Sequence, residues 1–298
     1  MFQRLLYIIG FCILSSASAS EQSPPRITWL TDVDPDVPVA TPTSSSDINS
    51  QLLALYQPYL KDFDVQPRFV NSARAQAMLS EQAHVCRGKS VYNEERGQYA
   101  YASALPQVVF PPLRLYMLAS HRLADQVEAL KSASEDDHLS LQEVLSLSPN
   151  LTLGLVRGRS YGEDLDQALS RDRHSNQLWI RSVPDQASGL FDMLVSGRID
   201  LTIHTSVAME RFIQMSNQAQ PDLKVIPLRE ADRALLGYLL CNRSEQGQQF
   251  LQSVNLAIEE LSRTQEYFDM HMSWVPAAER PYLARLYNDI YGTSFRAD

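Results

Sequence analysis

The sequence predicts an α/β protein whose sheets are mostly parallel and flanked by helices. Strand-length apolar runs alternate with helical patterns, and the 298 residues are enough for two lobes, each with its own core. The alternation is clearest between residues 150 and 204. There, a strand at 151–156 is followed by a glycine-rich turn, two helical stretches and a strand at 199–203.

The N-terminal part shows the same order of elements. Residues 26–30 form an apolar strand, a loop rich in proline and serine follows, and Ser46-Asp47 is a good helix N-cap. A strand at 65–70 and a helix from Ser72 come after this first helix. The first helix carries an apolar stripe typical of a helix packed on a sheet, made of Leu52, Leu55, Tyr56, Tyr59 and Leu60.

The rest of the chain is assigned in order. Residues 84–86 and 113–119 are strand-like and flank a polar turn, and residues 123–148 indicate a polar, helical surface. Strands at 224–228 and 235–241 and an amphipathic helix at 248–263 precede a C-terminal tail rich in aromatic residues. We expect this tail to pack against the first lobe.

Charge and the N-terminal segment limit the function. A formal net charge of -9 argues against nucleic-acid binding and against an electrostatic hold on anionic membrane. Residues 1–19 combine Arg4, an apolar core at 5–14 and Ala17-Ser18-Ala19, which predicts a cleaved signal peptide and a periplasmic protein. The alternative, an uncleaved membrane anchor, is disfavoured because this core is too short to span a bilayer comfortably.

Cysteines and histidines have few candidate roles. In an oxidising compartment, Cys86 and Cys241 suggest one disulfide, with two buried free thiols as the alternative. The six histidines lie far apart, with no pair at ligand spacing, so the sequence predicts no metal site and no cofactor.

The turn from Gly158 to Gly162 formally matches G-x-S-x-G, the nucleophile elbow of α/β-hydrolases. In that hypothesis Ser160 is the nucleophile of a secreted esterase, and Asp200 with His204 or His271 completes the triad. The absence of an HGGG-type oxyanion segment and the strand position of His204 weigh against it. The favoured alternative is a loop that cradles a small, anionic ligand group, and the protein is then not an enzyme.

Several segments, taken in order, resemble the type 2 periplasmic solute-binding proteins of family 3, which typically bind polar amino acids. RITWLTDVDP is similar to the first strand and its ligand-facing loop, and Asn93-Glu94-Glu95-Arg96 stands where the family carries T-x-E-R. LGLVRGRSYGEDLD, LVSGRIDLTIH and the returning strand with the final helix resemble later landmarks. The two cysteines look like those of a less-characterised subgroup.

The resemblance implies two lobes joined by two crossovers, with a ligand bound between them. After the signal peptide at 1–19, the first lobe comprises residues 20–117 and 235–298, and the second comprises residues 118–234. The crossovers are expected near 116–121 and 227–235. Cys86 and Cys241 then lie in the same lobe, which supports the disulfide.

The resemblance also assigns binding residues. Arg96 corresponds to the arginine that grips a ligand carboxylate, although it could instead pair with Glu94 or Glu95 on the surface. Ser160 and the backbone at 158–161 meet the same group from the second lobe. Further candidates are a loop carboxylate, with Asp34 as an alternative, three cleft walls and one residue of the second lobe: Asp32, Trp29, Tyr92, Tyr161 and Thr205.

Thr205 marks a departure from the family, because no carboxylate stands near it to hold a ligand ammonium. A standard α-amino acid is therefore in doubt. The resemblance implies a monomer that captures a small polar or carboxylate-bearing solute for an ABC-type permease. The alternative is a periplasmic partner that reports its ligand to a membrane receptor.

Overall fold

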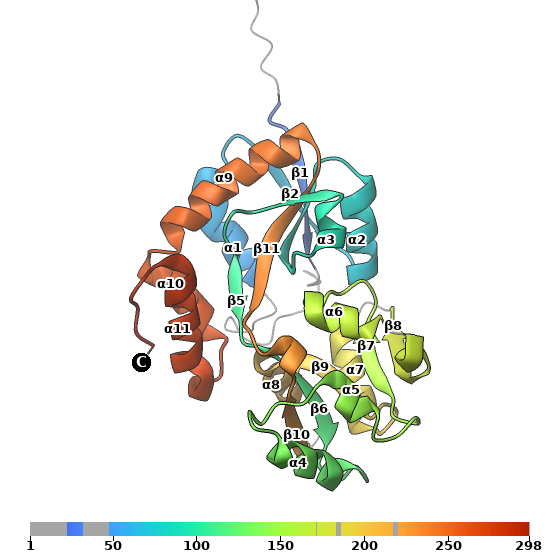
Figure 1. The fold of residues 1–298 in the computed structure, drawn as a ribbon. Coiled ribbons are helices and arrows are strands. Elements are labelled where there is room, and N and C mark those ends of the chain that lie inside the picture. The colour runs from blue at the N-terminus through green and yellow to red at the C-terminus, as the bar shows by residue number, and fades with distance from the viewer. Residues whose placement is uncertain (1–22, 32–47, 171, 183–185, 217–219, 298) are drawn as a thin grey trace, which may run out of the picture.

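The computed structural model describes residues 23–31, 48–170, 172–182, 186–216 and 220–297, and its strands form two separate sheets (Figure 1). The first sheet has the order β2-β1-β3-β11-β4, and β5 also pairs with β11. Its strands are β1 Arg26–Thr31, β2 Asp64–Phe69, β3 Val85–Ser90, β4 Ala100–Ala102, β5 Val108–Phe110 and β11 Leu235–Asn242. We call the part of the chain built on this sheet the first lobe.

Apart from the four-residue α3, the helices of the first lobe carry apolar residues that recur on one side and pack into the core. Asn71 caps α2 by accepting a hydrogen bond from the Arg74 N–H, and Ser244 caps α9 in the same way. The predicted helix at 248–263 is confirmed as α9, and the aromatic tail contributes Trp274 and Tyr287 to the core of this lobe, as expected. The helices are α1 Ile48–Tyr56, α2 Ser72–Glu81, α3 Glu94–Gly97, α9 Glu245–Leu261, α10 Gln265–Ser273 and α11 Arg280–Tyr291.

The second lobe is built on a sheet of order β10-β6-β9-β7-β8. All residues of β7 and β9 are buried, because helices cover both faces at the centre of this sheet. The strands are β6 Leu113–Leu118, β7 Leu153–Val156, β8 Leu178–Arg181, β9 Leu201–Thr205 and β10 Leu223–Pro227. The helices are α4 Ala124–Ala133, α5 Leu141–Leu145, α6 Glu163–Leu169, α7 Gln186–Val195 and α8 Ser206–Met215.

The chain passes between the sheets twice, between β5 and β6 and from β10 to β11. The predicted α/β class is confirmed, and both sheets are mixed, since β6 and β11 run antiparallel to their neighbours. The expected lobe boundary at residue 117 falls inside β6, which pairs with β9 and β10 along its length. The first crossing therefore lies between Phe110 and Leu113, earlier than the expected 116–121.

Cys86 and Cys241 face each other on β3 and β11 and form the predicted disulfide, with an S–S distance of 2.03 Å. Among the described residues, no helix is both long and apolar enough to cross a membrane. The same residues contain no group of three or more histidine, cysteine or acidic side chains that could hold a metal ion. The predicted signal peptide lies outside the described residues.

His271 of α10 is enclosed by aromatic rings, including those of Tyr267, Tyr287 and Tyr291. Its Nδ1 lies 2.8 Å from the Tyr267 carbonyl oxygen, so the neutral ring donates there. Burial lowers the pKa of His271 to about 4. In the folded state the His271 ring therefore stays neutral at pH values at which the same ring in the unfolded chain, with a pKa near 6.5, is protonated.

We expect acid to destabilise the protein through His271, with full stability above about pH 6.5 and progressive loss toward pH 4. Between pH 7 and pH 5, the free energy of unfolding should fall by about 2 kcal/mol less in His271→Phe than in the unaltered protein. Urea unfolding at both pH values measures these differences. His204, whose pKa burial also lowers, stays in place and leaves a residual slope. Equal losses in the variant and the unaltered protein would contradict the role of His271.

Candidate functional site

Arg96 lies on α3, where Asn93 caps the helix by accepting a hydrogen bond from the Arg96 N–H at 3.0 Å. The Arg96 side chain is buried against the second lobe. Its Nη1 donates to the Val91 carbonyl at 2.6 Å, and its Nη2 donates to the Gly158 carbonyl at 3.1 Å. Arg96 is thus at the contact between the lobes and is not exposed on the surface.

Electrostatics at Arg96 reflect this position. Burial lowers the pKa of its guanidinium from the ordinary value, and the nearby Tyr99, Asp166 and Glu95 offset part of that shift. Hydrogen bonds to two carbonyl oxygens keep the charge solvated by protein groups. A guanidinium held in this way remains a cation that can attract an anionic group.

The turn after β7 supplies the opposite side of the contact. Gly158 and Gly162 have φ of 72° and 99°, the left-handed region that glycine adopts without strain. Ser160 Oγ donates to Asp166 Oδ2 at 2.5 Å, and the Tyr161 N–H donates to Asp166 Oδ1 at 2.7 Å. The carboxylate of Asp166, on α6, is therefore bound by the turn that we expected to bind a ligand.

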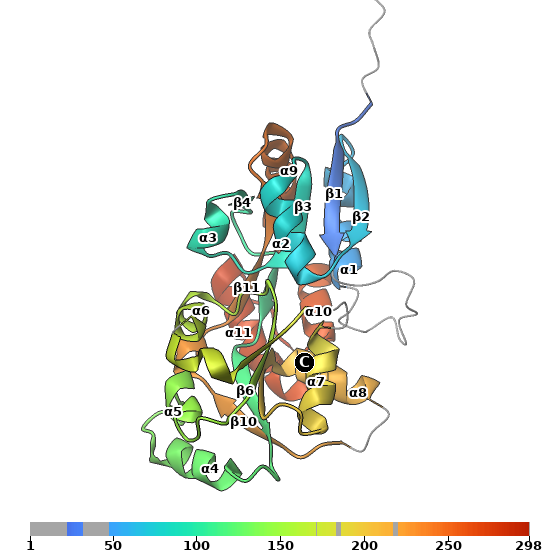
Figure 2. The ribbon, with the colours of Figure 1, turned by 90° about the vertical axis from the view of Figure 1, so that its right-hand side faces the viewer.

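The two lobes touch directly at this place. Asn93 Nδ2 lies 3.5 Å from both Ser160 Oγ and Asp166 Oδ2. Gly158 approaches α2 so closely that a Cβ added there would stand 2.8 Å from the Ala73 Cα. Both views place α6 immediately below α3 (Figure 1 and Figure 2). The structure thus places Arg96 and the turn that carries Ser160 in one closed contact between the lobes.

The other predicted residues lie elsewhere. Tyr161 is in the second-lobe core, where its hydroxyl accepts a hydrogen bond from the Val156 N–H, and Trp29 is in the first-lobe core. Thr205 is buried and caps α8. Tyr92 is 46% exposed and its ring covers Gly97. Asp32 and its alternative, Asp34, lie outside the described residues.

A second contact between the lobes lies near the crossovers. Ser206 Oγ, at the start of α8, donates to Glu279 Oε2 at 2.6 Å. Val207 packs into the first-lobe core. Thr205 pairs with Leu113 just after the first crossing, so this contact is close to the crossovers. The Arg96 contact is made by the turn after β7, which lies two strands across the sheet from β6.

The catalytic triad proposed for a hydrolase is not assembled. None of the hydrogen bonds of Ser160 within the described ranges goes to a histidine. His204 is buried beside Thr202, with 3.1 Å between Nε2 and Oγ1, and Asp200 instead pairs with His121 at 2.9 Å. Ser160 consequently has no histidine base among the described residues, and the triad that the esterase hypothesis requires is not formed.

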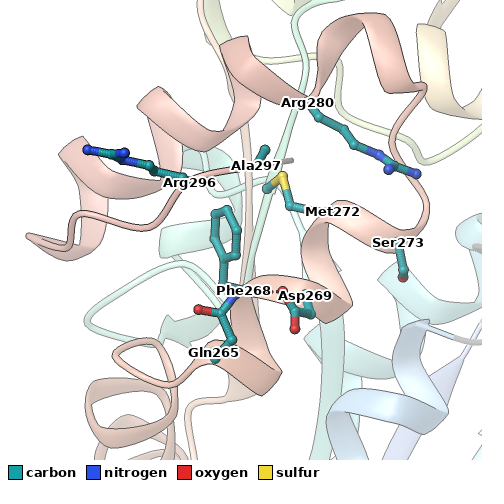
Figure 3. Close-up of a pocket in the computed structure, with 8 residues that line it drawn as sticks. All are labelled: Gln265, Phe268, Asp269, Met272, Ser273, Arg280, Arg296 and Ala297. Carbon is teal, nitrogen blue, oxygen red and sulfur yellow. Dashed lines mark hydrogen bonds between the residues drawn. The ribbon is translucent and has the colours of Figure 1, made fainter.

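Two pockets lie away from the contact between the lobes. One, of about 240 Å³, has an apolar floor that includes Phe268 and Met272, and its arginines, Arg280 and Arg296, point away from each other (Figure 3). The other, of about 330 Å³, is lined by Trp29, Thr31, Ser50, Leu53, Ala54, Gln57 and Pro67. Trp29 is the one predicted binding residue on their walls.

Comparisons with known proteins support the fold. No family model and no curated protein matches the chain. A structure reported for glutathione import via GshT and the cystine ABC importer TcyBC of Streptococcus mutans is similar, with 16% identity, a TM-score of 0.57, and 92% of this chain and 98% of that chain covered. An ancestral arginine-binding protein bound to arginine has 12% identity and a TM-score of 0.59, covering 86% and 99%.

A histidine kinase sensor domain with similarity to periplasmic binding proteins is also similar, with 12% identity, a TM-score of 0.60, and 84% of this chain and 96% of that chain covered. At such identities the likeness establishes the fold. The chain therefore has the two-lobed α/β fold of periplasmic solute-binding proteins.

Proposed function

We propose that this protein is a periplasmic, monomeric solute-binding protein that captures a small polar or carboxylate-bearing solute between its lobes for import through an ABC-type permease. The observation that carries the proposal is the convergence of Arg96 from the first lobe and the Ser160 turn from the second. Solved proteins of the same fold include arginine-binding and cystine-import proteins. In this proposal the protein binds its solute without catalysing a reaction and without a cofactor.

The mechanism follows from the two lobes and their crossovers. In the open form, Arg96 is released from the Gly158 carbonyl, and its planar guanidinium can donate two parallel hydrogen bonds to a carboxylate. Ser160 and the backbone of its turn then meet the same group from the second lobe. A solute that contacts both lobes binds the closed form better and shifts the equilibrium toward it.

A second function, sensing for a membrane receptor, is favoured by one observation. The similar histidine kinase sensor domain shows that this fold also serves signalling. Both functions use the same solute-driven closure. Genes for a permease and an ATPase beside this gene would support import, whereas a neighbouring receptor kinase or cyclase would support sensing.

A thermal-shift screen of amino acids, polyamines, carboxylates and small peptides tests the binding function. A solute that binds only the folded protein raises its Tm. For any carboxylate-bearing hit, we expect Arg96→Ala to abolish the shift, because the variant lacks the guanidinium at the contact between the lobes. Arg74→Ala is the matched control, since Arg74 is exposed on α2 of the same lobe.

The outcomes of this screen separate the two claims. A hit whose Tm shift survives Arg96→Ala would remove Arg96 from the site while retaining the binding function. A screen in which no solute raises the Tm of the unaltered protein would contradict the binding function for those solute classes.

A further inference from the structure

The Asp166 carboxylate is contacted from both lobes. From its own lobe it accepts hydrogen bonds from the Ser160 hydroxyl at 2.5 Å and the Tyr161 N–H at 2.7 Å. From the first lobe, Asn93 Nδ2 approaches its Oδ2 at 3.5 Å, and its charge acts on the buried guanidinium of Arg96. Among the described residues, Asp166 is the carboxylate that accepts hydrogen bonds from this turn.

These groups are of the kind that binds a solute carboxylate. A carboxylate held between two lobes can accept hydrogen bonds from hydroxyl and backbone N–H donors on one side and pair with a cation on the other. Ser160, Tyr161 and Arg96 were predicted to play these parts for a solute, and here the first two donate to Asp166. Asp166 is thus placed as a solute carboxylate would be, although it belongs to α6.

We propose that the Asp166 carboxylate is a built-in occupant of the anion position between the lobes, and that a carboxylate-bearing solute binds only by displacing it. This inference rests on the proposed function and names the residue that determines the specificity of the same site. Asp166 therefore disfavours weakly bound anions and admits solutes whose other contacts compensate for its release.

Donor counting explains why displacement is required. The Ser160 hydroxyl and the Tyr161 N–H each have one proton to donate, and both go to Asp166. A second carboxylate at the same place would lack these donors and would repel the first. Asp166 is only partly buried, so its side chain can turn toward solvent and leave both donors to the solute.

A simpler role is that Asp166 only stabilises the turn that precedes α6. Under that role, removing its charge loosens the turn and creates no anion site. The proposed role predicts that Asp166→Asn gains anion binding, whereas the simpler role predicts no gain, so one titration decides between them.

Acetate is a suitable probe, because it carries a carboxylate and nothing else that could bind. We would follow the backbone amide resonances of Tyr161 and Gly162 during acetate titration of isotope-labelled, ligand-free protein. In the unaltered protein and in Asp164→Asn, we expect little response at millimolar acetate. Asp164 is an exposed aspartate of the same helix, so its variant matches the charge change.

In Asp166→Asn, we expect a saturable response of the Tyr161 amide, with an acetate affinity at least about tenfold higher than in Asp164→Asn. Adding Arg96→Ala to Asp166→Asn should abolish the response, which shows that the anion is held from both lobes. Asp166→Ala should respond like Asp166→Asn, and dispersed resonances verify that each variant is folded.

The proposal is overturned if Asp166→Asn and Asp166→Ala respond no more strongly than Asp164→Asn, or if their response persists without Arg96. The binding function fails separately, in the thermal-shift screen of the unaltered protein. An acetate response in Asp166→Asn together with a failed screen would retain the role of Asp166 and reject the proposed solute classes.

Discussion

Loss of the disulfide between Cys86 and Cys241 is expected to lower the free energy of unfolding by about 4 kcal/mol in the double variant Cys86→Ala/Cys241→Ala. The bond joins residues 155 positions apart, so it removes much of the freedom of the unfolded chain. It also ties β3 to β11, the strand on which the chain returns from the second lobe. Urea unfolding of the double variant beside the unaltered protein measures the effect.

Reduction provides the control for this prediction. Both sulfurs are buried in the first-lobe core, so alanine avoids the unpaired hydroxyls that serine would bury there. A thiol reductant should destabilise the unaltered protein and leave the double variant unchanged. If reductant and substitution both leave the urea midpoint in place, the bond contributes nothing to stability.

The sequence predicted those features that depend on local patterns. The strand before Gly158 and the amphipathic helix that became α9 follow from periodicity. The disulfide followed from export and from the resemblance. The periodic patterns lie within single segments, and the two cysteines are a pair of side chains with few alternative roles.

Features that depend on distant partners could not be predicted in the same way. The apolar run of β6 reads as a strand in any sheet, and only its pairing with β9 and β10 places it in the second lobe. Tyr161 and Trp29 are large aromatic residues, which are as suitable for a core as for a cleft wall. Tyr161 lies in the core of the second lobe, and Trp29 lies in that of the first.

Asp166 was missed for a related reason. In a helical pattern it stands on the polar side, next to the buried Leu165, and such residues normally face solvent. Asp166 follows closely in sequence a turn that supplies a hydroxyl and an N–H donor, and this is the local signal that could have identified it. The approach of Asn93 from the other lobe has no counterpart in the sequence.

The two contacts between the lobes that are described above lie at different distances from the crossovers. The Ser206–Glu279 hydrogen bond is close to the crossovers, so it can persist while the lobes rotate. The contact of Arg96 with Gly158 lies farther from the hinge and must break when the lobes separate. Under the proposed opening, the close approach of the Gly158 turn to α2 makes Gly158 a suitable position at which to disturb the closed contact.

We expect Gly158→Ala to prevent the closed contact. The added Cβ would stand 2.8 Å from the Ala73 Cα, closer than backbone and side-chain carbons approach, and the backbone of α2 cannot yield as a flexible side chain could. The lobes must then separate, which breaks the hydrogen bond from Arg96 to the Gly158 carbonyl. Small-angle scattering of the ligand-free variant should show a larger radius of gyration than that of the unaltered protein.

Gly162→Ala separates this clash from backbone strain. Both glycines have positive φ, so alanine is strained at either position, and more so at Gly162, whose φ of 99° and ψ of 154° lie in a region that glycine alone normally adopts. A Cβ at Gly162, however, meets nothing within 4 Å. The control should therefore lose some stability and keep the radius of gyration of the unaltered protein. If the two variants scatter identically, the clash of a Gly158 Cβ with α2 does not separate the lobes in solution.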